Sequence, residues 1–302
     1  MIDYKKIFKN RELRLKIIKL LSFIPTKIYL KIIYRIRTGK RLNLKNPKGF
    51  NEKLQWLKVN NKNPNYTELV DKIKVREYIK NKIGEEYLFP IYGFWKTFDD
   101  IDFSKLPNSF VLKCSHDSGS VKIIKDKKLL SNKDYEQLSK FYKGRLKLNP
   151  YCLSREYPYK NVEPFIIAEK YMISSENEES GINDYKFFCF NGVPQILMII
   201  SGRQKKDVGG YREDFVDMNY NKLPITNGEQ CSEVLPDKPK NFEKMKELAT
   251  LLSKDMPHVR LDFYELDGNI YFGEFTFFSA GGLILFEPDE WEEKMGNWIN
   301  IN

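Results

Sequence analysis

Apolar residues recur at helical spacing near the start of the chain. They run through residues 11–38, and Pro25 divides the run into two predicted helices, with Thr26 as a cap for the second. Lysines and arginines interrupt the run, so a membrane span is excluded. Two interpretations stay open: a helical hairpin packed on the rest of the protein, or a basic amphipathic surface that lies on an anionic bilayer.

Residues 51–83 predict two further helices, separated by a turn-rich stretch at 60–65. After Tyr87 the pattern changes to short apolar runs bounded by turn residues. These runs predict strands at 109–114, 165–172, 186–190 and 193–200.

Asn191-Gly192 lies between the last two of these strands and favours a two-residue hairpin turn. A helix is predicted over 242–253, followed by two more strands around Asp267-Gly268. Helices followed by a largely antiparallel sheet with interposed helices predict an α+β fold.

Composition restricts the chemistry more than the partners. The 302 residues carry a formal net charge of +10, which suits nucleic acid, a membrane surface or a phosphate-bearing or uronic-acid substrate, and equally a solvated lysine-rich surface. The four cysteines have no metal-ligand spacing, and no signal peptide is visible, so we expect reduced thiols and a cytoplasmic location. With only two histidines, catalysis is expected to depend on Lys, Arg, Asp and Glu.

The last two predicted strands carry acidic residues whose register can be argued. With a three-residue loop over 267–269, Asp262 falls opposite Glu274 on one side of the sheet. Arg260 then faces Thr276 on the same side, and Tyr264 faces Phe272. A two-residue loop would put the two carboxylates on opposite faces.

Directly opposed carboxylates repel each other and are tolerated where a cation bridges them. Two oxygen ligands completed by water and substrate phosphates are the usual way in which Mg²⁺ is held. The alternative is an exposed hairpin whose polar face meets water, with Arg260 screening Asp262.

A second candidate site follows the predicted strand that ends in Lys113. This strand leads into a loop of small residues, and a lysine beside backbone N–H groups suits a phosphate. Three further segments are weak signals when each is taken alone: Asp71-Lys72 at a helix start, Glu169 to Met172 at a strand end, and Asp184 to Lys186 at a strand start.

Taken in order, these elements resemble the ATP-grasp superfamily, and within it the TupA-like branch named for teichuronopeptide biosynthesis. The order is Asp-Lys, a strand lysine with a glycine loop, apolar-Glu-Lys-aromatic-apolar, Arg-x-Asp and Glu-x-Thr. The most characteristic stretches are 50–58, 106–113, 184–187 and 271–276, and the likeness extends from about Pro47 almost to the C-terminus.

The resemblance implies a nucleotide clasped as MgATP between two α+β subdomains. We expect an N-terminal helical region over 1–86, a small subdomain with the lysine and glycine loop over 87–168, and a C-terminal subdomain with the metal-binding hairpin over 169–302.

The resemblance also implies a role for each candidate residue. By this resemblance, Lys72 and Lys113 bind the α- and β-phosphates of ATP, and Ser118, Gly119 and Ser120 cover the γ-phosphate. The hinge that binds adenine is formed by Glu169, Lys170, Tyr171 and Met172. Asp184 binds the ribose hydroxyls, and Lys186 lies beside the nucleotide. Mg²⁺ is bound by Asp262, Glu274 and Thr276. Arg260 faces the acyl phosphate and its tetrahedral adduct.

Two positions depart from the superfamily pattern. Thr276 stands where the wider superfamily usually has an asparagine as a further metal ligand, which leaves a second metal open. Ala280-Gly281-Gly282 replaces the usual Pro-Gly, so the acceptor pocket is expected to differ.

The activity implied is an ATP-dependent carboxylate–amine ligase that forms an amide through an acyl phosphate. Its implied partners are an acid and an amine in surface polysaccharide assembly, the acid being a uronic acid or a peptide-bearing glycan, and no nucleic acid. A glycosyltransferase is the main alternative, because Asp100-Ile101-Asp102 has the composition of a metal-binding Asp-x-Asp. A membrane-binding module acting through the N-terminal helices is compatible with either.

Overall fold

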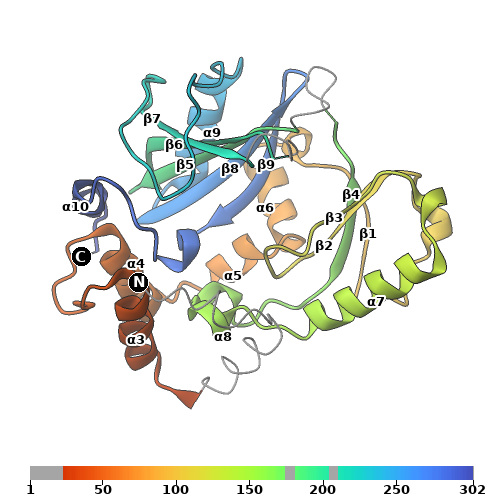
Figure 1. Cartoon of the computed structure of the whole chain (residues 1–302), viewed down its shortest axis with the longest axis horizontal. Coiled ribbons are helices and arrows are strands. Elements are labelled where there is room, and N and C mark those ends of the chain that lie inside the picture. The colour runs from red at the N-terminus through yellow and green to blue at the C-terminus, as the bar shows by residue number, and fades with distance from the viewer. Residues whose placement is uncertain (1–22, 174–180, 204–209, 302) are drawn as a thin grey trace. The chain divides into compact units, whose positions relative to one another are not determined.

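The computed structural model describes residues 23–173, 181–203 and 210–301 (Figure 1). The predicted helix before Pro25 therefore lies outside the described residues, except for its last positions. Packing divides the chain into two compact units, each with its own sheet. Residues 64–150 and 158–173 form what we call the four-stranded unit, and the rest of the described chain forms the five-stranded unit.

The predicted domain boundaries at 86/87 and 168/169 stay a prediction. By packing, residues 64–86 group with the four-stranded sheet. Two hydrogen bonds are among the contacts that join this segment to the sheet: the backbone N–H of Lys72 donates to the carbonyl of Ser115 at 3.3 Å, and Arg76 Nη1 donates to the carbonyl of Phe89 at 2.9 Å.

The sheet of the four-stranded unit has the order β1-β4-β2-β3, with antiparallel neighbours throughout. Its strands are β1 (Ile91–Trp95), β2 (Phe110–Cys114), β3 (Lys122–Ile124) and β4 (Ile166–Lys170). The strands predicted over 109–114 and 165–172 are confirmed as β2 and β4. The apolar pattern does not predict β1 and β3, because both are edge strands whose side chains are largely half-buried or exposed.

The helices of this unit are α5 (Asn65–Val70), α6 (Lys74–Lys82) and α7 (Asn132–Leu146), with 3-10 turns η2 (Glu85–Tyr87), η3 (Phe103–Lys105) and η4 (Lys127–Leu129). The second helix predicted within 51–83 is thus divided into α5 and α6. Asp71 explains the break, because its Oδ1 accepts the backbone N–H groups of Ile73 and Lys74 and so starts α6.

Alternate side chains of β2 form the centre of the four-stranded core. Phe110, Leu112 and Cys114 are fully buried and pack in one cluster with Leu138 and Tyr142 of α7. A capping box starts α7: Ser131 Oγ accepts the Asp134 N–H, and the Asp134 carboxylate accepts the Ser131 N–H at 2.9 Å.

The sheet of the five-stranded unit has the order β7-β6-β5-β8-β9, again antiparallel. Its strands are β5 (Asp184–Phe190), β6 (Val193–Ser201), β7 (Arg212–Val216), β8 (His258–Leu266) and β9 (Asn269–Thr276). Every residue of the central strand β5 is buried. The helix predicted over 242–253 is confirmed as α9 (Phe242–Ser253), with Met245, Leu248 and Leu252 buried.

The remaining helices of this unit are α3 (Thr26–Thr38), α4 (Phe50–Asn60), α8 (Tyr151–Ser154) and α10 (Glu290–Trp298), with the 3-10 turn η6 (Ser279–Gly281). A further 3-10 turn, η5 (Tyr157–Tyr159), lies at the chain crossing between the units. Among the residues that the structure describes, no helix is both long and apolar enough to span a membrane.

Two tight turns connect strands of the five-stranded sheet. The predicted Asn191-Gly192 turn is confirmed, since Phe190 pairs with Val193 across it. The predicted three-residue loop over 267–269 is wrong: Leu266 pairs with Asn269, which leaves only Asp267 and Gly268 in the turn. Both have positive φ, 50° and 76°, as the favoured hairpin turn with two left-handed residues requires.

Candidate functional site

The acidic residues of β8 and β9 lie on one face of the sheet, as predicted, but for a different reason. Asp262 pairs with Glu274 and Arg260 with Thr276, although the turn has two residues. A bulge between these pairs and Phe263–Phe272 adds Gly273 to β9 and restores the register. A Cβ at Gly273 would lie 2.9 Å from the Tyr264 ring and 3.0 Å from the Asp262 carbonyl, so the bulge needs a glycine.

The bulge corrects one predicted pair. Tyr264 pairs with Tyr271 rather than with Phe272. Phe272 instead packs against Phe263 and Phe275, with ring centroids 6.2 Å and 5.2 Å away, in the apolar face. Burial of this phenyl ring in the core is the physical reason for the shift.

Asp262 is the centre of a buried ion-pair cluster. Its side chain is 1% exposed and accepts Arg260 Nε at 2.7 Å and Arg260 Nη2 at 2.8 Å. Lys186, directly opposite on β5, forms an ion pair with the same carboxylate. Burial alone would raise the pKa of Asp262, but the two cations outweigh it and the pKa is lowered.

Arg260 joins Asp262 to the edge of the hairpin. Its Nη2 also donates to Thr276 Oγ1 at 3.1 Å and to Glu274 Oε1 at 3.3 Å. Burial works to lower the pKa of Arg260, but the neighbouring Asp262 and Glu274 outweigh this effect and raise it. The guanidinium is therefore a permanent cation on this face.

Asp184 begins β5 next to this cluster. It is buried, its Oδ1 lies 3.5 Å from Lys186 Nζ, and it forms an ion pair with Arg203. It pairs with Tyr264 of β8, and burial together with the Asp184 charge raises the pKa of the Tyr264 phenol. The structure thus brings together five predicted residues on one face: Asp184, Lys186, Arg260, Asp262 and Glu274, with Thr276 beside them.

The donor set fits Mg²⁺ bound together with phosphate. Two carboxylates from adjacent strands and one hydroxyl share the face, and Glu274 is 39% exposed. Within the described residues no group of three or more His, Cys, Asp or Glu side chains converges as a metal site. Mg²⁺ does not need one, because it is commonly bound by one or two carboxylates while phosphate and water supply its other ligands.

A polar stripe on α4 positions the segment that follows β9. Asn51, Gln55 and Lys58 share one face of the helix and are all buried. They donate to backbone carbonyls of the segment 281–284: Asn51 Nδ2 to Ile284 at 2.5 Å, Gln55 Nε2 to Gly282 at 2.6 Å, and Lys58 Nζ to Gly281 at 2.7 Å.

These three hydrogen-bonding residues give a structural role to the stretch 50–58, which is one of the stretches that carry the family resemblance. The three residues preceding Leu283 all have positive φ, at 47°, 69° and 65°, so the segment that stands in place of Pro-Gly is a left-handed turn. Lys58 also donates to the carbonyl of Ser154 at 2.8 Å, and burial lowers its pKa to about 8. The sequence analysis did not predict that Asn51, Gln55 and Lys58 hold this turn. Their spacing of i, i+4 and i+7 places them on one side of a helix, and this pattern can be detected in the sequence.

In the four-stranded unit, Lys113 is paired across the sheet. Its Nζ lies 2.7 Å from Glu169 Oε2, both side chains are largely buried, and the residues are diagonal neighbours on β2 and β4. Glu169 is followed by the exposed Lys170 at the end of β4, and by Tyr171 and Met172, which are half-buried. The backbone N–H of Lys170 donates to the carbonyl of Pro90 at 2.9 Å.

Lys72 contacts the loop that follows β2. Its Nζ donates to the carbonyl of Asp117 at 2.7 Å and to that of Ser115 at 3.4 Å. The structure therefore places Lys72 at the start of the serine–glycine loop, and Lys113 on the strand that leads into it.

The serine–glycine loop, residues 115–120, is held from inside. Ser120 is buried, and its Oγ accepts the Cys114 N–H at 2.8 Å and donates to Asp117 Oδ1 at 2.5 Å. Ser118 and Gly119 are exposed, and Gly119 has a φ of 77° with open space around its Cβ position. The outward part of the loop is thus Ser118-Gly119, whereas the Ser120 hydroxyl is used internally.

Two residues of α7 complete this support, and sequence reasoning missed both. Arg145 forms a buried ion pair with Asp117, and its Nη2 donates to the Ser118 carbonyl at 2.6 Å. The Tyr142 hydroxyl contacts the carbonyls of Leu112 and Ser120 at 2.8 and 2.9 Å. A signal exists, because Arg145 continues the buried stripe of Leu138 and Tyr142 at i, i+4 and i+7.

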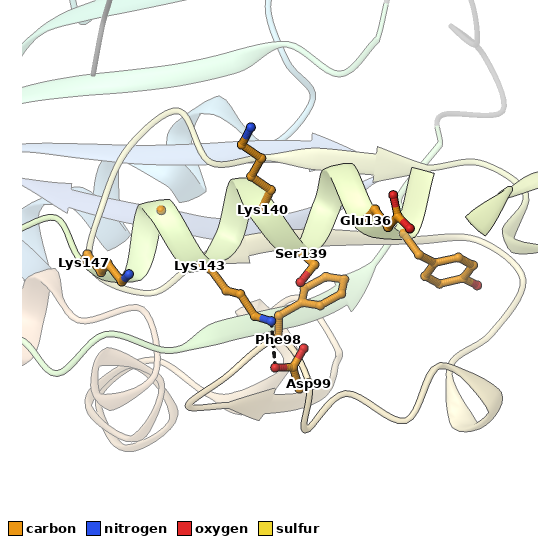
Figure 2. A pocket seen from close by; sticks show the side chains of 9 residues that line it. Phe98, Asp99, Glu136, Ser139, Lys140, Lys143 and Lys147 are labelled. Carbon is orange, nitrogen blue, oxygen red and sulfur yellow. Dashed lines mark ion pairs between the residues drawn. The ribbon is translucent and has the colours of Figure 1, made fainter. Parts of the chain in front are cut away.

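The other side of α7 borders a shallow pocket of about 680 Å³ (Figure 2). Its lining includes Lys140, Lys143 and Lys147, and Lys143 forms an ion pair with Asp99 at 2.8 Å. None of the predicted nucleotide-binding residues lines it, so this basic surface is separate from the serine–glycine loop.

The remaining sequence candidates have local roles. Asp100 Oδ2 accepts the Thr97 N–H at 3.2 Å, and Asp102 Oδ1 accepts the Ser104 N–H at 3.0 Å. The two carboxylates of the Asp-x-Asp thus cap neighbouring turns. Both histidines are buried, and burial lowers their pKa values, that of His258 to about 3, so each is neutral near pH 7.

Comparison with known proteins identifies the family. A family model described as TupA-like ATP-grasp matches residues 52–300. None of the curated proteins matches the sequence.

Several solved structures are similar. The D-alanine–D-alanine ligase from Bacillus anthracis complexed with ATP has a TM-score of 0.40 and 17% identity, over 69% of this chain and 54% of that one. The ATP-grasp ligase PsnB complexed with minimal precursor, Mg and ADP has a TM-score of 0.39 and 10% identity, over 75% and 58%. This chain therefore spans about half the length of the first. Because these TM-scores are low, family membership rests on the sequence match.

Proposed function

The chain belongs to the TupA-like ATP-grasp family, and from that premise we propose that it is an ATP-dependent carboxylate–amine ligase. The observation that carries the proposal is the face on which Asp262, Glu274 and Thr276 lie together, with the Arg260 guanidinium hydrogen-bonded to all three. Carboxylates beside a fixed cation suit a reaction in which negative charge moves between phosphate and carbonyl oxygens.

The nucleotide contacts in this proposal are those that the family resemblance implies. Lys72 and Lys113 bind the α- and β-phosphates, and the exposed Ser118-Gly119 with Ser120 covers the γ-phosphate. The hinge residues Glu169, Lys170, Tyr171 and Met172 bind adenine largely through backbone groups. Asp184 accepts the ribose hydroxyls, and Lys186 lies beside the nucleotide. Arg260 and Lys186 together keep Asp262 ionised.

Asp262 and Glu274 would hold Mg²⁺, with Thr276 as a further ligand or as a partner of a metal-bound water. When bound, the ion neutralises charge on the phosphoryl oxygens. Arg260 is held on this face by Asp262, whose carboxylate accepts its Nε and Nη2 hydrogens.

In the reaction, an oxygen of the acid substrate attacks the γ-phosphorus of ATP, and ADP leaves with the electrons of the broken P–O bond. The amine then attacks the acyl carbon, the acyl C–O bond breaks with its electrons leaving on inorganic phosphate, and the amine gives up a proton to the phosphate or to solvent as the amide forms. Arg260 donates hydrogen bonds to the oxyanion of the tetrahedral adduct. The serine–glycine loop excludes water, which would otherwise hydrolyse the acyl phosphate.

We further propose that the acid is a uronic acid or a peptide-bearing glycan in surface polysaccharide assembly, and that nucleic acid is not a substrate. A net charge of +10 is compatible with an acidic substrate. The family is named for teichuronopeptide biosynthesis, and this name points to the same class of acid.

The test is ADP formation from ATP with uronic acids and amino acids supplied singly and in pairs. The proposal expects ADP, phosphate and an amide only when acid and amine are both present. Glu274→Gln is expected to abolish the reaction, whereas Asp102→Asn, a surface carboxylate, leaves it unchanged. A phosphorylated acid released over many turnovers without amine would identify a kinase, and release of UDP or GDP from a sugar nucleotide would identify a glycosyltransferase; either result overturns the ligase.

A further inference from the structure

Helix α3 exposes a row of isoleucines on the side that faces away from its own core. Ile28, Ile32 and Ile36 lie one turn apart and are 52%, 46% and 43% exposed. The opposite side of the helix buries Tyr29, Leu30 and Tyr34 against Leu42. A row of three large apolar side chains in successive turns is unusual on a soluble surface and indicates a docking face.

The charges beside this row all have the same sign. Lys27, Lys31 and Arg35 precede the three isoleucines by one position each, so a basic row runs along the apolar row, and all three are exposed. The helix contains no acidic residue over Thr26–Thr38. We call Ile28, Ile32 and Ile36 with Lys27, Lys31 and Arg35 the α3 face.

The charge pattern selects the partner. A second copy of the chain, docked on this face, would bring two basic rows together and would be repelled. An anionic bilayer offers phosphates to the basic row and the acyl boundary to the isoleucines, which is the arrangement of interfacial amphipathic helices. We propose that the α3 face binds the surface of a bilayer that contains anionic lipid. The binding does not depend on the ligase activity.

The test is co-sedimentation of the full chain with vesicles of phosphatidylglycerol and phosphatidylcholine in equal parts, and with vesicles of phosphatidylcholine alone. The chain is expected to bind the first and not the second, and to dissociate as salt is raised. Ile32→Ser is expected to weaken binding by about fivefold. Leu251→Ser is the matched control, because Leu251 of α9 is also 46% exposed, and it is expected to bind like the wild type.

A second pair of variants separates the α3 face from overall charge. Lys27→Glu with Lys31→Glu is expected to reduce binding by about 25-fold or more, at about fivefold per lysine removed. Lys140→Glu with Lys147→Glu changes the net charge equally on the basic side of α7 (Figure 2), and is expected to reduce binding much less.

Several results would overturn the proposal. These are equal binding to both vesicle types, equal losses for the two charge pairs, or no loss for Ile32→Ser. A dimer in lipid-free solution that Ile32→Ser dissociates would show that a second copy covers the face. Amide exchange in α3 that vesicles leave unchanged would show that the bilayer does not contact this face.

Discussion

The hairpin β8–β9 and the serine–glycine loop after β2 hold candidate site residues in opposite ways. At the hairpin, the candidate residues support one another: Asp262 is neutralised by Arg260 of the same strand and by Lys186 of the adjacent strand β5. In the loop, the carbonyls of Ser118 and Ser120 on either side of Gly119 are held by residues with no proposed role in the chemistry, Arg145 and Tyr142 of α7.

This difference has an energetic consequence. In the hairpin, removing one charge both disables the site and leaves buried opposite charges without a partner. In the loop, the support can be removed while the residues that face the ligand stay unchanged. In the hairpin, the buried Asp262 should therefore carry both binding and stability, whereas in the loop a supporting residue that touches no ligand should lower stability and weaken binding indirectly. The following predictions test this comparison, from the largest expected effect to the smallest.

Asp262→Asn should have the largest effect. The variant leaves Arg260 and Lys186 facing a neutral amide, so the free energy of unfolding should fall by about 3–5 kcal/mol. Mg²⁺-dependent binding of ATP should fall by about a hundredfold or more. Urea unfolding and titration calorimetry measure the two effects.

Glu274→Gln is the control for this variant. Glu274 is half-exposed and contacts Arg260 only at 3.3 Å, so its loss should cost about 1 kcal/mol or less of stability while ATP binding falls as strongly. Equal stability losses in the two variants would contradict the proposed burial of charge at Asp262.

Arg145→Met tests the support of the loop. Asp117 would stay buried without its cation, so the free energy of unfolding should fall by about 3 kcal/mol. ATP binding should weaken although every proposed ligand residue is intact. Lys143→Met, on the exposed side of the same helix, removes only a surface pair with Asp99 and should cost less than about 1 kcal/mol.

A double-mutant cycle sharpens this test. Adding Asp117→Asn to Arg145→Met removes the unpaired charge and should recover part of the lost stability. If the double variant is as unstable as the sum of the single variants, the two residues are not coupled and the loop is held by other contacts.

The turn after the hairpin is an exception within the five-stranded unit, because Lys58 supports it from outside. In the folded chain the pKa of Lys58 is lowered by burial to about 8, against 10.5 in the unfolded chain. Between these values the unfolded state binds more protons, so stability rises with pH from about 8 and is unaffected by this group at lower pH.

Between pH 8 and 9.5 the rise should be about 2 kcal/mol in the wild type and absent in Lys58→Met. Urea midpoints across this range measure it, with the exposed Lys45→Met as a control that keeps the rise. A rise that persists in Lys58→Met belongs to another group.

Gly119→Ala should have the smallest effect. Space exists for the methyl group, but the φ of 77° is strained for alanine, which costs about 1 kcal/mol. ATP affinity should fall by about fivefold if the loop conformation binds phosphate. Gly144→Ala in α7, where nothing lies within 4 Å of the added Cβ, should instead raise stability by about 0.5–1 kcal/mol. Unchanged stability in Gly119→Ala would show that the loop relaxes freely.

Much of the fold follows from local pattern. The helix α9, the Asn191-Gly192 turn and the strands β2, β4, β5 and β6 are predicted because their periodicity and turn residues act over a few positions. Edge strands β1 and β3 have little burial to leave a pattern, so the sequence does not reveal them.

The β8–β9 hairpin shows most clearly what the sequence determined and what only the tertiary structure decided. The sequence determined that Asp262 and Glu274 share a face, because the apolar residues of both strands must reach the core. Only the tertiary structure decided how. The turn has two residues, and packing of Phe272 against Phe263 and Phe275 places a bulge at Gly273.

The residues that hold the serine–glycine loop and the turn after the hairpin were decided by tertiary structure alone. Arg145 reaches Asp117 from 28 positions along the chain, and Lys58 reaches Gly281 from 223 positions away. Periodicity shows that such polar residues lie on a buried side of a helix. Their partner is set by long-range packing, because a buried charge takes whichever opposite charge or carbonyl the fold brings to it.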